Sequence, residues 1–416
     1  MIFFVVVCGV CCRYFVGKVC GRGLRRVWAG WSRPTKSDLL REMANIEVHL
    51  KQFHDASVGV NDAATKDRAE AFLQAFVSQP YAQAVALAII TEKHGNAKVP
   101  TFPAQTKFRA VNALRKIVLK NWETTPVTSR LSLRSQLFGL AVDTDFAART
   151  EQFVVRQLLQ FVAVMYKRGW FDGQGEPSPP HLDLLQRVKA LFARAGEQQL
   201  RGAQFVGMVI EEFATSHSVA IGLSVDFHKR CANSFKEAAL PELFTVALRF
   251  LAASQQSNPT PNDHQVSVQM TVETLKIVNA TLGWDFEDKL GRFETSHHAD
   301  GRASSSQHLK AAMVRPGYKW QSLLFNPQIF QVLLKAATPN AAVTSYALKR
   351  QHHLARQCLI QMASLDGKMY KLDSAGRPRA PAEQTALKRK MATAALVCIN
   401  CVLVVAVDSS DVTTHL

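Results

Sequence analysis

Residues that could do chemistry are few in this sequence, and their spacing assembles no catalytic or metal site. The histidine pairs at 297–298 and 352–353 have no further ligands at metal-site spacing. Asp226 and His228 could suggest acid–base chemistry, but Ser224 or Asp226 also suits the residue that caps the start of a helix. We prefer the helix-cap interpretation. The expected protein is therefore not an enzyme and holds no cofactor and no metal.

Sequence motifs for nucleotide binding and hydrolysis are missing. The sequence contains no GxxxxGK[ST] phosphate loop, no GxSxG nucleophile turn and no HExxH zinc helix. Each of these chemistries needs its groups at fixed spacing on one turn or one helix face. The sequence therefore indicates binding, not catalysis.

The eight cysteines fit neither a zinc site nor a disulfide framework. Half of them crowd into residues 8–20 without a second ligand group, and Cys398 and Cys401 lie near the C-terminus. Only Cys231 and Cys358 fall in the middle, each among apolar residues with helical spacing. We expect reduced thiols in a protein of the nucleus and cytoplasm.

Composition indicates a folded chain, with 47% apolar and 20% charged residues. The formal net charge of +17 would suit nucleic acid, an anionic membrane or an acidic protein. The basic residues are scattered, however, and do not alternate with aromatic residues as in nucleic-acid-binding modules. No direct nucleic-acid partner is expected.

The N-terminal segment, residues 1–42, differs from the rest of the sequence. An apolar run at 2–12 precedes the basic residues, whereas a signal peptide carries its positive charge first. A signal anchor with its basic side in the cytoplasm is one alternative. Our preferred interpretation is that translation starts at Met43, since an ordinary amphipathic segment follows.

The C-terminal segment, residues 371–416, is interpreted as a basic linker to about residue 390 followed by an apolar tail. Basic residues at 388–390, an apolar run at 391–407 and a short polar end are typical of a tail-anchored membrane protein. The alternatives are a buried helix and read-through into non-coding sequence. Thr393 and Asn400 interrupt the run, so membrane association is not expected.

Between residues 43 and 365, apolar residues recur at spacings of three and four, which predicts amphipathic helices. Pro80 should divide the first pair, and Gly169 should end the clearest helix. The four tryptophans at or near helix ends, at 122, 170, 284 and 320, should pack between repeats. The helices are predicted over 68–95 (two helices), 106–122, 128–141, 147–168, 181–195, 197–216, 239–254, 264–282, 320–336 and 341–365.

These helices predict an all-α chain of paired helices, at about 40 to 50 residues per pair. That spacing is typical of HEAT-type repeats, which stack into a superhelix called an α-solenoid. A globular helical bundle is the alternative, but it should show longer helices with fewer breaks. We therefore predict a HEAT-type solenoid, and the resemblance described next implies that it is truncated.

Five runs, in order over residues 43–370, carry more than helical periodicity. They are EQFVVRQLLQFVAVMYKRGWFD (151–172), IGLSVDFHKRCANSFKEAALPELFTVALRFL (221–251), TLGWDFEDKLGR (281–292), VRPGYKWQSLLFNPQIFQVLLK (314–335) and CLIQMASLDGKMY (358–370). These runs resemble the exportin-4 family of nuclear transport receptors. The sister exportin-7 family is the nearest alternative, since KRGWFD and ELFTVAL resemble it too. The apolar ends have no counterpart in the family.

This resemblance implies a karyopherin that binds the GTP form of the GTPase Ran, protein cargo and phenylalanine-glycine nucleoporins. It would shuttle between nucleus and cytoplasm. The implied N-terminal HEAT repeats, residues 43–172, would carry the Ran contacts. Residues 173–370 would form further repeats with a polar insertion at 287–312. Cargo contacts of later repeats would be missing.

Candidate contacts follow from helix geometry and not from a family motif. The helix at 128–141 should pair with the one at 106–122, as the second helix of that pair. The second helix of each pair should line the concave side, which would place Arg130, Arg134, Arg187 and Lys189 there. The simpler interpretation of each is solvated surface charge. Two other functions stay open: a helical scaffold that binds proteins without a transport role, and a tail-anchored membrane adaptor.

Overall fold

The computed structural model describes residues 36–94, 97–172, 179–214, 223–254, 264–286, 314–338 and 345–411. Helices account for most of these residues, and the described strands form one small antiparallel hairpin, β1 (Lys93–His94) with β2 (Ala97–Lys98). The all-α prediction is confirmed. The chain divides into two compact units, Met1–Thr125 and Pro126–Leu416.

The described part of the first unit contains α2 (Lys36–Gly59), α3 (Lys66–Phe76), α4 (Ala82–Thr91) and α5 (Ala104–Lys120). Helix α4 packs on α2 and α5, and its sequence, AQAVALAIIT, is apolar except at Gln83 and Thr91. Such a helix must be largely covered, and six of its ten residues are buried while Gln83, Leu87 and Thr91, on one side, are half-buried. The predicted break at Pro80 is confirmed.

One ion pair is buried in this apolar unit. Lys107 of α5 has only 2% of its side chain exposed, and its Nζ lies 2.5 Å from Oε1 of Glu92. Glu92 follows α4 directly and adopts a left-handed backbone conformation, with φ of 57°. The pair therefore joins the end of α4 to α5.

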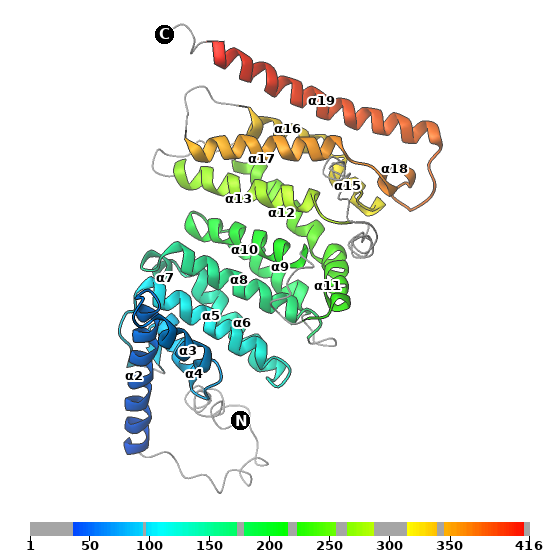
Figure 1. The fold of residues 1–416 in the computed structure, drawn as a ribbon. Helices are drawn as coiled ribbons and strands as arrows, with labels where there is room; N and C mark the ends of the chain where they lie inside the picture. The colour runs from blue at the N-terminus through cyan, green and yellow to red at the C-terminus, as the bar shows by residue number, and fades with distance from the viewer. Residues whose placement is uncertain are drawn as a thin grey trace, which may run out of the picture. The chain divides into compact units, whose positions relative to one another are not determined.

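The second unit contains four pairs of helices, and each pair packs on the next (Figure 1). The first helices of the pairs form one layer, here called the first-helix layer: α6 (Val127–Val142), α9 (Pro180–Phe192), α12 (Leu240–Ser254) and α16 (Pro327–Ala337). The second helices form the second-helix layer: α8 (Gln152–Arg168), α10 (Glu197–Ala214), α13 (His264–Leu282) and α17 (Tyr346–Ala363). Each second helix packs on its own partner and on the second helix of the next pair. This stacking confirms the helical-repeat prediction.

Short elements connect or flank these pairs. They are α7 (Thr144–Ala148), α11 (Val225–Ala238), the 3₁₀-helix η4 (Tyr318–Trp320), α15 (Gln321–Leu324) and α18 (Lys368–Lys371). The last described helix is α19 (Pro381–Asp411), which packs on α16 and α17. Ser224 caps α11, as one of the two sequence alternatives proposed, because its Oγ accepts a hydrogen bond from the Phe227 amide.

Two predicted helices are interrupted in the structure. The helix expected over 147–168 starts earlier, as α7, which Asp143 caps by accepting from the Phe146 amide at 2.7 Å. Helix α7 ends at Ala148 and α8 begins at Gln152, with no side-chain cap at Glu151. The helix expected over 320–336 is interrupted at Asn326, whose side chain accepts from the Gln328 amide. Asn326 thereby competes with the backbone for this amide, which starts a new helix there.

The C-terminal region differs from the predicted linker. Residues 381–390 form the first turns of α19, and Met391, Ala395 and Cys398 are buried. Spacings of four and three residues put these side chains on one helix face. The first part of the apolar run is therefore packed against protein.

Among the described residues, no helix is both long and apolar enough to cross a membrane. The apolar run continues through residues 401–407, whose side chains lie outside the described set. The tail-anchor hypothesis concerns those residues and stays a prediction. The polar insertion at 287–312, the N-terminal run at 2–12 and the cysteines at 8–20 also lie outside the described residues.

Helix α10 packs between α8 and α13 and is buried on nearly all sides. Its two internal glycines have different surroundings. A Cβ atom at Gly202 would lie 2.9 Å from Cβ of Leu191 on α9, whereas a Cβ at Gly207 would meet nothing within 4 Å. Gly202 therefore permits the close approach of α9 and α10.

These glycines give a matched pair of substitutions. We expect Gly202→Ala to lower the free energy of unfolding by about 1 to 3 kcal/mol, because α9 must move away. Gly207→Ala should raise it by up to about 1 kcal/mol through helix propensity. Urea denaturation of both variants measures this, and equal effects of the two substitutions would contradict the packing described.

Candidate partner-binding surface

The four basic residues proposed as partner contacts lie in the first-helix layer, not on second helices as expected. Arg130 and Arg134 belong to α6, and Arg187 and Lys189 belong to α9. The sequence prediction paired the helix at 106–122 with the one at 128–141. In the structure α5 pairs with α4 and α6 pairs with α8, so the pairing is shifted by one helix. The expected placement was wrong for this reason.

One carboxylate joins three helices beside these residues. Asp183 of α9 accepts a hydrogen bond from Oη of Tyr166 on α8 at 2.7 Å and pairs with Nη2 of Arg134 on α6 at 3.0 Å. Nε of Arg187 lies 2.8 Å from the other carboxylate oxygen. The Arg134 guanidinium also stacks over the Tyr166 ring, 4.0 Å from its centroid. This cluster of four residues, here called the Asp183 cluster, fixes how α6, α8 and α9 meet.

The charges of the cluster follow from its surroundings. Burial alone would raise the pKa of Asp183, but the hydrogen bonds from Tyr166 and Arg187 and the charge of Arg134 hold it below its usual range. Burial raises the pKa of the Tyr166 hydroxyl, which stays protonated and donates to the carboxylate. Asp183 is therefore ionised at neutral pH, pairs with both arginines and offsets one of their two charges.

The four residues predicted as contacts differ in the exposed fraction of their side chains. Arg134 has 7% of its side chain exposed and is committed to the Asp183 cluster. Arg130 is 11% exposed and pairs with Asp172 at 3.0 Å, and Arg187 is 27% exposed. Lys189 is 56% exposed, and its partner Glu242 on α12 is also open to solvent. Lys189 is therefore the most accessible of the four, and Arg134 supports the surface from below.

The sequence did not indicate a second buried cluster, at the end of α8. Lys167 is fully buried, and its Nζ donates to the backbone carbonyl of Glu212 on α10 at 2.5 Å. Burial lowers the pKa of Lys167, against the opposing charge of Glu212. Lys167 stands beside Arg168 and Gly169, a sequence typical of an exposed helix end, and only the covering helices α10 and α11 show that it is buried.

Two further groups near Lys167 are held in unreactive states. Burial raises the pKa of the Cys231 thiol to about 12, so the thiol is protonated at neutral pH. Burial and the charge of Lys167 lower the pKa of His228. Cys231, Cys358 and Cys398 are buried, and no disulfide joins them to another described residue. In the described part of the chain, no three His, Cys, Asp or Glu side chains are grouped to hold a metal.

The tryptophans pack between helices, as predicted. Trp122, Trp170, Trp284 and Trp320 are each no more than 6% exposed. The Trp170 ring meets Phe213 edge-on, with 4.8 Å between centroids, and its Nε1 donates to Ser234 Oγ at 2.9 Å. The Trp170 ring fills the seam between α8, α10 and α11, and burial leaves none of the four tryptophans open for ligand stacking.

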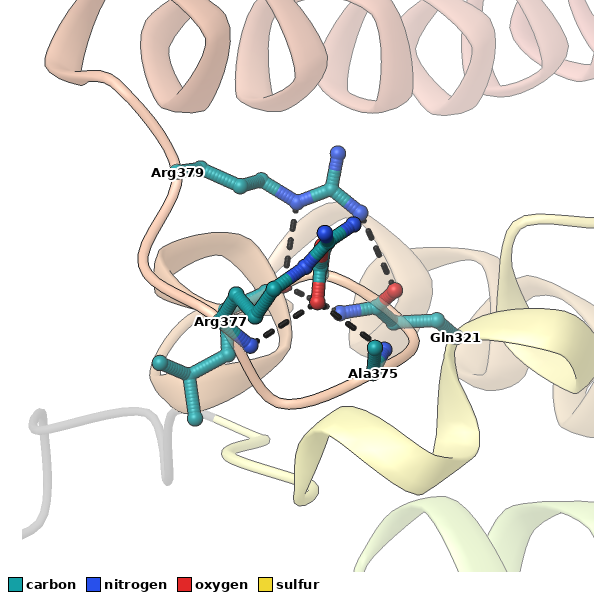
Figure 2. Close-up of polar contacts among 6 residues, drawn as sticks. Gln321, Ala375, Arg377 and Arg379 are labelled. Carbon is teal, nitrogen blue, oxygen red and sulfur yellow. Dashed lines mark hydrogen bonds and ion pairs between the residues drawn. The ribbon is translucent and has the colours of Figure 1, made fainter.

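A third polar cluster closes the turn before α19 (Figure 2). Gln321 donates to the carbonyls of Met369 and Leu372, and its Oε1 accepts from Nη2 of Arg379 at 3.0 Å. Nε of Arg379 donates to the same Leu372 carbonyl at 2.9 Å. Each polar group forms a hydrogen bond within the turn. The cluster therefore stabilises the connection of α15 and α18 to the start of α19.

The Asp183 cluster predicts a pH-dependent contribution to stability. Because the pKa of Asp183 is lowered on folding, its contribution is present above the usual aspartate pKa of about 4 and is lost as the pH falls through the lower folded value. At pH 7, Asp183→Asn should lower the free energy of unfolding by about 2 kcal/mol. The difference from the unsubstituted protein should shrink in acid.

The matched control is Glu237→Gln, which breaks an exposed pair with Lys319. It should change the free energy of unfolding by less than about 0.5 kcal/mol at either pH. Urea denaturation at pH 7 and at a pH well below about 4 measures both variants. A pH-independent loss for Asp183→Asn would show that the carboxylate charge does not hold the three helices together.

Comparison with known proteins places these features in a family. The sequence model of the exportin-4 family matches residues 47–375, which is well over half of the chain. Exportin-7-B of Xenopus laevis is 23% identical over 253 residues, covering 60% of this chain and 21% of the relative. Exportin-7-A of the same species is 21% identical over 337 residues, covering 79% of this chain and 27% of the relative.

A third relative is Ran-binding protein 16 of Drosophila melanogaster, 21% identical over 246 residues. That match covers 59% of this chain and 21% of the relative. The chain thus spans only about a fifth to a quarter of the length of these relatives. From the matched residues 47–375 and the stacked helical pairs within them, the chain belongs to the exportin-4 family.

Proposed function

We propose that this chain is part of a nuclear export receptor of the karyopherin type. It binds the GTP form of Ran, carries protein cargo past phenylalanine-glycine nucleoporins and shuttles between nucleus and cytoplasm. The observation that carries this proposal is the family match over residues 47–375. A relative named Ran-binding protein 16 supports Ran as the regulatory partner.

The helical pairs are physically suited to such a role. Each pair adds a few side chains to a long surface, and small changes between neighbouring pairs let that surface adjust to a partner. The sequence has no phosphate loop of its own, so the nucleotide is held by Ran and is sensed through Ran's shape and charge. Contacts that are present only with the GTP form of Ran would make binding depend on the nucleotide.

Within this proposal, Lys189, Arg187 and Arg130 contact the partner, and Arg134 positions Arg187 through Asp183. Lys189 is the most exposed of them, and it pairs with Glu242, whose side chain is 41% exposed. A partner carboxylate could displace Glu242 at small cost, because an exposed ion pair contributes little to stability. Releasing Arg134 would break its ion pair with Asp183 and its contact with the Tyr166 ring, so Arg134 stays in the cluster.

A pull-down of the whole chain tests the receptor proposal. Ran loaded with a non-hydrolysable GTP analogue should retain the chain at least about ten times better than Ran–GDP, as a differential affinity requires. Equal recovery on both forms, or on neither, would remove the transport function for this chain.

The contact proposal has its own test. Lys189→Glu should weaken binding to Ran–GTP-analogue by about five- to tenfold through charge repulsion. The matched control is Lys319→Glu, because Lys319 is also exposed and also pairs with an exposed glutamate. An unchanged affinity for Lys189→Glu, with the GTP preference intact, would move the contact elsewhere and leave the receptor proposal standing.

A further inference from the structure

One face of α17 carries exposed basic and apolar side chains, and none of them forms an ion pair within the described residues. Tyr346, Lys349, Arg350, His353 and Ile360 are all exposed. Their spacing of three, four and seven residues puts them along a single stripe of the helix. This set of five is here called the α17 stripe.

The opposite side of α17 is fixed in the protein core. Leu348, Leu354, Cys358, Leu359 and Met362 are buried. The helix packs on α13, α16 and α19, and it lies between α13 and α19 in Figure 1. The α17 stripe is therefore the remaining open face of a rigidly held helix.

Positive charge on this face is not balanced locally. Helix α17 contains no acidic residue, and within the described part of the chain no ion pair involves Lys349 or Arg350. Residues 345–390 contain ten lysines and arginines but only three carboxylates. Two of those three are already paired, Asp366 with Lys388 and Asp373 with Arg377. A basic surface with so few counter-charges is suited to an acidic partner.

The apolar ends of the stripe narrow the choice of partner. Tyr346 is 79% exposed at the first turn of α17, and Ile360 is 56% exposed near its end. Fourteen residues of helix separate them by about 21 Å. Two apolar anchors at that distance, with basic residues between them, fit a protein segment with apolar residues at its ends and carboxylates in the middle.

Other anionic partners fit this stripe less well. Binding of single-stranded nucleic acid requires aromatic rings between the basic residues, and Tyr346 is the stripe's only aromatic residue besides His353. A membrane-surface helix buries its apolar face in lipid, whereas the apolar face of α17 is already buried in protein.

We infer that the α17 stripe is a docking site for an acidic protein segment with an apolar residue near each end. The segment lies along α17, its carboxylates pair with Lys349 and Arg350, and its apolar residues cover Tyr346 and Ile360. This site is separate from the surface on α6 and α9, and its occupation does not require Ran.

The whole chain can be tested with synthetic peptides. The probes are fluorescein-labelled acidic peptides of about 15 residues, long enough to match the stripe, with leucine or phenylalanine at each end at varied spacing. Fluorescence polarisation measures affinity at low and moderate salt. The variants are Lys349→Glu with Arg350→Glu, and separately Ile360→Ser. The matched control is Lys66→Glu with Arg68→Glu, which reverses two exposed basic residues on α3.

The expected result is peptide binding that weakens with salt and falls at least about tenfold in the α17 charge reversal. Ile360→Ser should lower the peptide affinity about three- to tenfold, and the α3 control should lower it less than about twofold. Circular dichroism confirms that each variant is folded.

Three results would overturn the proposal. They are no binding by any peptide of the set, an equal loss in the α3 control, or an unchanged affinity for Ile360→Ser. Tighter α17-dependent binding of a single-stranded oligonucleotide, or of vesicles containing phosphatidylserine, would also overturn it by assigning the stripe to another class of partner.

Discussion

The whole second unit depends on one constraint: no helix pair in it can cover its own apolar surface. Helix α10 shows this most clearly, since it is buried on nearly every side by α8, α9 and α13. Removing any neighbour would expose apolar side chains that only the next pair can cover. Stability in such an array is a sum over adjacent pairs, so the pairs must stack in order. The absence of a Cβ at Gly202 lets α9 and α10 approach closely enough for this stacking.

Apolar burial does not by itself fix how far one helix is rotated against the next. Polar groups between the helices determine this rotation. Asp183 joins α6, α8 and α9 through Arg134, Tyr166 and its neighbour Arg187. Lys167 joins α8 to the end of α10 through a backbone carbonyl. A buried polar group has few geometries in which its hydrogen bonds are satisfied, so these contacts select one packing. The exposed position of Lys189 follows from the same arrangement.

Much of the fold could be predicted from the sequence because helix periodicity is a local signal. The positions of α9, α10, α12 and α13 follow from the spacing of their apolar residues, and the breaks at Pro80 and Gly169 follow from backbone chemistry. The shift of helix pairing could not be predicted, because every segment is amphipathic and the pattern does not say which neighbour covers it. The cap at Asn326 was present in the sequence but was outweighed by the continuing apolar pattern, and no side-chain cap marks the break between α7 and α8.

The candidate surface was harder to predict than the fold. Arginine and lysine are usually exposed, so nothing in the sequence marked Arg134 and Lys167 as buried. Their partners Asp183 and Glu212 lie 49 and 45 residues away along the chain. Only the tertiary contacts show which basic residues are buried in internal ion pairs and which are exposed to solvent. The packing of the tryptophans was easier to predict, because a large apolar ring at a helix end is usually buried between neighbouring repeats.

Hydrogen–deuterium exchange of the chain tests the central claim most directly, since it reports where Ran binds as well as whether it binds. With Ran holding a non-hydrolysable GTP analogue, amides of α6 and α9 should gain protection that Ran–GDP does not give. Equal protection of these helices by the two forms of Ran, or no protection by either, would contradict the account of this chain as the Ran-sensing part of an export receptor.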